Sequence, residues 1–158
     1  MEFWTKVISF VASFNCGVSL VNLPEEIIEK YAELTGFDLK EDSNIETVLE
    51  TSYCVGCAVG CMVTPLYAKK LGFDKTLRML FIGFIVVCLA TIIPIHWLYL
   101  TGMQFLTGFT ALSIGTLTPL VVAENLDAEQ RGKTMMVYAI SLNVGICEHY
   151  LISFEYAL

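Results

Sequence analysis

Five long apolar runs, separated by shorter charged segments, constrain this 158-residue chain more than any other feature. A helix needs about 20 apolar residues to cross a bilayer, because the hydrocarbon core is roughly 30 Å thick and an α-helix rises about 1.5 Å per residue. The sequence therefore predicts an all-α membrane protein with five transmembrane helices. These predicted spans lie at approximately 3–22, 45–67, 77–94, 97–123 and 134–154, with an acidic outer loop at 23–44.

The composition agrees with lipid as the solvent of most of the chain. Hydrophobic residues make up 56% of the sequence and charged residues only 16%, whereas a soluble domain is about 25% charged. The net charge of −7 excludes nucleic acid as a partner, because a phosphate backbone requires a basic face. No nucleophile–base pair or phosphate-binding loop is present, so we expect neither an enzyme nor a cofactor, and the lipid bilayer is the expected environment.

The lysines and arginines predict the orientation, because cytoplasmic loops of membrane proteins are enriched in them. Only Lys30 and Lys40 fall in the outer loop, whose acidic residues either attract cations or are simply hydrated. The other basic residues fall on the opposite side: Lys6, Lys69, Lys70, Lys75, Arg78, Arg131 and Lys133. We therefore expect a multi-pass plasma-membrane protein with a cytoplasmic N-terminus.

Small and polar residues within the spans admit two interpretations each. In the fourth span, hydroxyl residues recur at steps of three and could line a solute pathway or bond to neighbouring helices. In the second span, Gly56 and Gly60 form a small-xxx-small pattern that favours helix packing. Cys54 and Cys57 have the spacing of a redox or zinc motif, although small residues packing between helices explain them as well. The hydroxyl residues are Thr107, Thr110, Ser113 and Thr116.

Polar groups inside a membrane usually face a bundle interior or a water-filled cavity. Asn15 lies well inside the first span, and Asn143 and Tyr150 lie seven residues apart on one face of the fifth, with Ile146 between them. Glu148, also in the fifth span, could carry a proton or pair with a cation, or be hydrated near the outer end. Asn15, Asn143, Ile146 and Tyr150 are the candidate lining of a solute pathway.

The segment at the end of the fourth span resembles a known family signature. Pro119, Glu124, Arg131 and Gly132 match the P-x-Y-x-x-E…R-G pattern of sugar porters, with Val121 in place of the aromatic residue. These transporters belong to the major facilitator superfamily and include the facilitative glucose transporters. The stretch around Asn15 and the outer-loop segment from residue 22 to residue 31 are similar to the end of the first helix of glucose transporters and the loop after it.

The resemblance implies that the chain forms the first five helices of an N-terminal six-helix half. It implies that Glu124 and Arg131 belong to a cytoplasmic gate and that the fifth helix contacts the sugar. The chain departs from the family at several places, among them the cytoplasmic loop after the second span, where only Lys70 and Gly72 match. Ala139 stands where the family has a sugar-binding glutamine, and Gln104 stands where the fourth helix normally opens with an arginine.

The sequence leaves two functional hypotheses, and a third possibility is that the chain is a five-helix protein unrelated to the sugar porters. In the first, the chain is an N-terminal fragment of a transporter that moves a sugar or similar small solute by alternating access, as facilitative hexose transporters do. In the second, it is a truncated membrane protein that does not transport and associates with full-length porters. The expected partners are a small solute and a second transporter half or a full-length porter.

Overall fold

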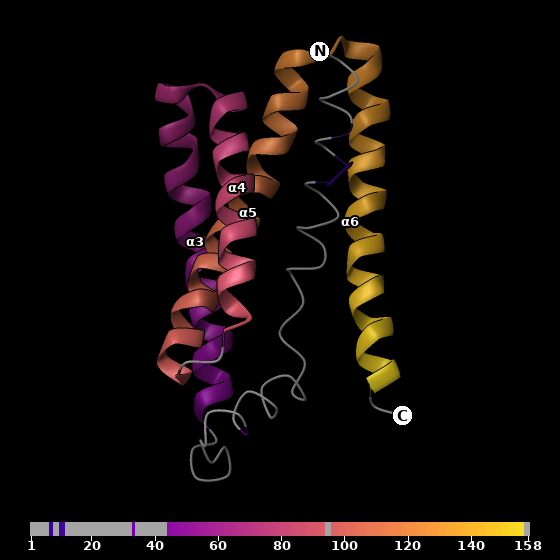
Figure 1. Ribbon diagram of the computed structural model, residues 1–158. Coiled ribbons are helices and arrows are strands. Elements are labelled where there is room, and N and C mark those ends of the chain that lie inside the picture. Colours follow the sequence, from indigo (N-terminus) through magenta and orange to yellow (C-terminus); the bar gives the residue numbers. More distant parts are fainter. Residues whose placement is uncertain (1–6, 8–9, 12–32, 34–43, 94–95, 157–158) are drawn as a thin grey trace.

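The computed structural model describes residues 7, 10–11, 33, 44–93 and 96–156, and the described part consists of helices. Four long helices follow one another: α3 (Asn44–Leu71), α4 (Phe73–Thr91), α5 (Trp97–Asn125) and α6 (Ala128–Tyr156). They run alternately up and down, so that the α3–α4 and α5–α6 junctions lie at the same end (Figure 1). The predicted first span lies outside the described residues, except for Val7, Phe10 and Val11.

The connections between helices at that end are very short. A single residue, Gly72, separates α3 from α4, and only Leu126 and Asp127 separate α5 from α6. Gly72 has a φ of +91°, a conformation that residues with a Cβ rarely adopt. It lets the chain reverse without a loop, which places the basic residues 69–78 on the helix ends.

Helices α3 and α5 make the closest contact in the bundle, although α4 intervenes in the sequence. A Cβ added at Gly56 would overlap the carbonyl oxygen of Phe105, and one at Gly108 would overlap the carbonyl oxygen of Tyr53. At Gly60, an added Cβ would lie 2.8 Å from Ser113 Oγ. The two backbones therefore touch, which confirms that the Gly56–Gly60 pattern serves helix packing.

The apolar core lies where α3, α4 and α5 meet, and α5 supplies most of it. Helix α6 stands apart from α3 and α4 and approaches α5 near their shared junction (Figure 1). The buried core residues are Ala68, Leu77, Phe84, Ala111, Ile114, Leu117 and Val121.

Within the described residues, two helical segments are long and apolar enough to cross a membrane: Thr47–Leu71 and Trp97–Asn125. Helices α4 and α6 cover the third and fifth predicted spans but do not meet the same requirement. Helix α4 carries Asp74, Lys75 and Arg78 in its first two turns. Helix α6 begins with charged residues and later contains Asn143 and Glu148. The structure therefore supports an all-α membrane protein, and the number of five spans stays a prediction.

Candidate functional site

The α5–α6 junction holds the residues of the sequence signature. The last turn of α5 is closed by Asn125, whose Nδ2 donates to Val121 O at 3.0 Å. The backbone N–H of Leu126 donates to Val122 O at 3.2 Å, and Leu126 itself is buried. Helix α6 then begins at once, because the N–H groups of Gln130 and Arg131 both donate to Asp127 O. The turn is therefore tight and internally bonded.

Arg131 and Glu124, the two predicted gate residues, are both exposed at this junction. Arg131 Nε donates to Leu126 O at 2.7 Å, so the side chain folds back over the turn. No ion pair joins Glu124 to Arg131 in the part of the chain that the structure describes. Both residues are therefore accessible to a charged partner from outside this junction.

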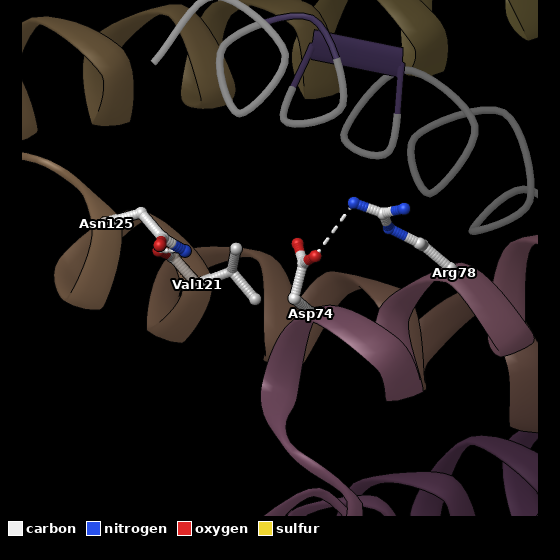
Figure 2. A network of polar contacts seen from close by, with 4 residues as sticks. All are labelled: Asp74, Arg78, Val121 and Asn125. Atoms are coloured by element: carbon white, nitrogen blue, oxygen red, sulfur yellow. Dashed lines mark hydrogen bonds and ion pairs between the residues drawn. The ribbon is translucent and has the colours of Figure 1, made fainter. Parts of the chain in front are cut away.

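An ion pair lies at the same end of the molecule, at the start of α4. Arg78 donates to Asp74 Oδ2 at 2.9 Å, one helical turn away, and both side chains are more than half exposed. Figure 2 shows this pair together with Asn125 and Val121 of α5. Sequence reasoning missed it, although the i,i+4 spacing of opposite charges is a recognisable signal. Screening by water makes the contribution of such an exposed pair to stability small.

All lysines and arginines within the described ranges gather at this end. None lies near the α4–α5 turn, where His96 forms the N-cap of α5 and accepts a hydrogen bond from Leu98 N at 3.2 Å. The end that carries the signature is therefore the electropositive end of the helices. Its basic residues are Lys69, Lys70, Lys75, Arg78, Arg131 and Lys133.

The predicted pathway residues are only partly described. Asn143 is exposed, and its Nδ2 donates to Ala139 O of the same helix at 2.7 Å. Ile146, which follows it on α6, is half-buried. Asn15 and the side chain of Tyr150 lie outside the described residues, so the structure does not bring the four together. The most buried face of α6 carries instead Thr134, Tyr138, Ser141 and Gly145.

The hydroxyl stripe of α5 serves mostly its own helix. Thr107, Thr110 and Thr116 donate to backbone carbonyls three or four residues earlier. Ser113 is different, because it is fully buried and accepts a 2.6 Å hydrogen bond from Thr64 of α3. Ser113 therefore joins α3 to α5. Of the four hydroxyl residues in the stripe, it is the one for which the predicted bond to a neighbouring helix is observed.

An open groove of about 540 Å³ lies near the opposite end, between α3 and α5. Two hydroxyls there are already used as donors, Thr51 to Thr47 O at 2.6 Å and Ser52 to Thr101 O at 2.8 Å. The groove was not expected from the sequence, because its two walls belong to α3 and α5, which are separated in the sequence by α4. It is lined by Thr47, Val48, Thr51, Ser52, Val55 and Phe105.

The Cys54-x-x-Cys57 pair forms neither a disulfide nor part of a metal cluster within the described segments. Cys57 is buried and Cys54 is exposed. One thiol therefore points into the bundle and the other away from it.

Antiparallel helices, an apolar core, close glycine contacts and a basic end together define a helical membrane-bundle protein. Comparison with known protein families identifies the class more closely, because the family model described as "Sugar (and other) transporter" matches residues 3–157. The chain belongs to this family of membrane transporters, within the sugar porters of the major facilitator superfamily. Neither a search of curated proteins nor one of solved structures found a significant match.

Proposed function

We propose that this chain moves a sugar or similar small solute by alternating access, as part of the N-terminal half of a facilitative hexose-type transporter. The observation that carries the proposal is the family match over residues 3–157. The position of the signature supports it, because Pro119, Glu124 and Arg131 flank the tight α5–α6 turn at the basic end of the bundle. In this proposal the chain sits in the plasma membrane with five spans and a cytoplasmic N-terminus.

In this function, Glu124 and Arg131 act as a cytoplasmic gate toward a second transporter half. Both are exposed, and the described part shows no ion pair between them, so each can pair with a charge on the other half. Such contacts form when the two halves close at the cytoplasmic side and break when they rock apart. The gate then stabilises one of the two states.

The solute pathway in this proposal uses Asn15, Asn143, Ile146 and Tyr150. Asn143 supplies an amide for hydrogen bonds to a solute hydroxyl, and its exposed position on α6 leaves the carbonyl of the amide accessible. Ile146 supplies an apolar wall one turn further on. A polar group with this placement fits a small hydroxylated solute better than a hydrocarbon.

Uptake of labelled hexose tests the proposal in cells that lack their own hexose transporters. The chain is expressed alone and together with the rest of a sugar porter, which comprises the sixth helix of the N-terminal half and the six helices of the C-terminal half. We expect uptake above background in the second case, and we expect Asn143→Ala to abolish it. The substitution leaves the fold intact, because Asn143 is exposed and its hydrogen bond stays within its own helix.

Val144→Ala is the matched control, since Val144 is an exposed neighbour on the same helix without a polar group. It should leave uptake unchanged. Uptake that survives Asn143→Ala would contradict the assigned pathway. If the membrane holds the folded pair of halves and no uptake occurs, the transport proposal itself fails.

Ala139 favours a second candidate function, a subunit that does not transport. It is exposed on α6 at the position where the family has a sugar-binding glutamine, and a methyl group cannot replace an amide toward a sugar hydroxyl. In this case the chain associates with full-length porters. Stoichiometric co-purification with a tagged full-length sugar porter, without uptake of its own, would support this function.

A further inference from the structure

Pro119 creates a specific gap in the hydrogen bonding of α5. The residue lies inside the helix, in the part that leads to its last residue, Asn125, and proline has no backbone N–H. The carbonyl that would accept from position 119 belongs to Gly115, four residues earlier. Gly115 is buried. A buried carbonyl without a donor is costly in a membrane protein, because no water replaces the missing bond.

Nearby hydroxyls on α5 do not fill this gap. Thr116 Oγ1 donates to Ser113 O at 3.0 Å, and Thr118 Oγ1 donates to Ile114 O at 2.8 Å. Each of these side chains is therefore engaged with a carbonyl other than that of Gly115. A polar side chain of a neighbouring helix can supply the donor instead.

Tyr138 of α6 is that donor. Its hydroxyl lies 3.0 Å from Gly115 O, across a separation of 23 residues in the sequence. Glycine at position 115 has no side chain to obstruct the phenol. Since α6 otherwise makes few contacts with α5, this hydrogen bond is a main link between the two helices.

We propose that Tyr138 is a positioning residue that replaces the hydrogen bond lost at Pro119 and thereby fixes α6 to the break in α5. The end of α5 after Pro119, the turn and the first turns of α6 then form one unit. That unit carries Glu124 and Arg131. The proposal concerns the packing of these helices and does not depend on whether the chain transports a sugar.

A double-mutant cycle between Tyr138 and Pro119 tests the proposal, using the full chain in bicelles and reversible unfolding by dodecyl sulfate, followed by circular dichroism. In the natural background, Tyr138→Phe should lower the ratio of folded to unfolded protein about three- to fifteen-fold, as for other interhelical hydrogen bonds in membranes. In the Pro119→Ala background the same change should have almost no effect. The alanine N–H then serves Gly115 O, and the tyrosine is no longer needed.

Pro65→Ala is the matched control, because Pro65 also lies inside a helix, but in α3 rather than in α5. Tyr138→Phe should lower the ratio of folded to unfolded protein by the same factor in the Pro65→Ala background as in the natural chain. Equal effects of Tyr138→Phe in the natural and the Pro119→Ala backgrounds would overturn the proposal. If Tyr138→Phe alone does not fold, recovery of folding in Tyr138→Phe/Pro119→Ala supports it, and failure of the double variant overturns it.

Discussion

Gly72 determines the backbone conformation of the α3–α4 junction. Its φ of +91° is combined with a ψ of 140°, a region of backbone conformations that is nearly restricted to glycine. An added Cβ would meet no atom within 4 Å. The requirement for glycine is therefore conformational and not steric.

Gly72→Ala should destabilise the chain by about 1–3 kcal/mol, because alanine must adopt this unfavourable conformation or move the helix ends. The measurement is the free energy of unfolding by dodecyl sulfate in bicelles. Gly102→Ala is the control, since Gly102 lies inside α5 and also has open space around its Cα. Alanine there should be neutral or stabilising. Equal effects at the two positions would contradict the conformational argument.

The roles of some residues could be predicted from the sequence, and the roles of others depend on tertiary contacts. The small-xxx-small pattern at Gly56 and Gly60 is local, so a packing role could be predicted, whereas its partner helix depends on tertiary structure. The bond from Tyr138 to Gly115 could not be predicted for the same reason, although Pro119 indicates a carbonyl without its donor. The one-residue reversal at Gly72 could not be predicted, because the pattern of residues 68–76 does not reveal it.

At the scale of elements, α5 is the helix around which α3, α4 and α6 gather (Figure 1). Its link to α3 combines backbone contact at Gly108 with the buried bond from Thr64 to Ser113. Tyr99 of α5 reaches α4 by donating to Ala90 O at 2.8 Å. Of the two helical segments that are long and apolar enough to cross a membrane, the one in α5 is accordingly more buried inside the bundle than the one in α3.

Gly108→Ala should separate α3 from α5 and destabilise the bundle by about 1–3 kcal/mol, as overpacking does in a dense core. The added methyl would overlap the carbonyl oxygen of Tyr53, and backbone cannot move aside as a flexible side chain can. Unfolding by dodecyl sulfate measures the loss. Gly83→Ala on α4 should have little effect, since its Cβ would meet only Thr110 Cγ2 at 4.0 Å. A silent Gly108→Ala would show that the helices do not touch there.

At the scale of the whole molecule, the alternating helices place the basic residues of two separate junctions at one end. The sequence alone predicted this separation of charge, because it depends only on the spacing of apolar runs. The arrangement of the candidate pathway could not be predicted in the same way. Asn143 is polar and central in its span, but its exposure depends on how α6 packs.

Cysteine labelling should show the basic end in the cytoplasm. In a chain whose native cysteines are replaced, His96→Cys should react with a membrane-impermeant maleimide in intact cells. Lys133→Cys should react only after permeabilisation, because the bilayer separates it from the reagent. Labelling of Lys133→Cys in intact cells, with His96→Cys protected, would reverse the proposed orientation.

The contact between α3 and α5 also has a consequence for biosynthesis. The residues joined by the Thr64–Ser113 bond are 49 positions apart, and α4 is made between them. At a synthesis rate of roughly 5–20 residues per second, α3 waits several seconds in the bilayer before its partner emerges from the ribosome. During that time the face of α3 that carries Gly56 and Gly60 is open to any other helix with small residues. The contact between α3 and α5 therefore forms only after α4 has been made, so that this part of the bundle assembles in the order of synthesis.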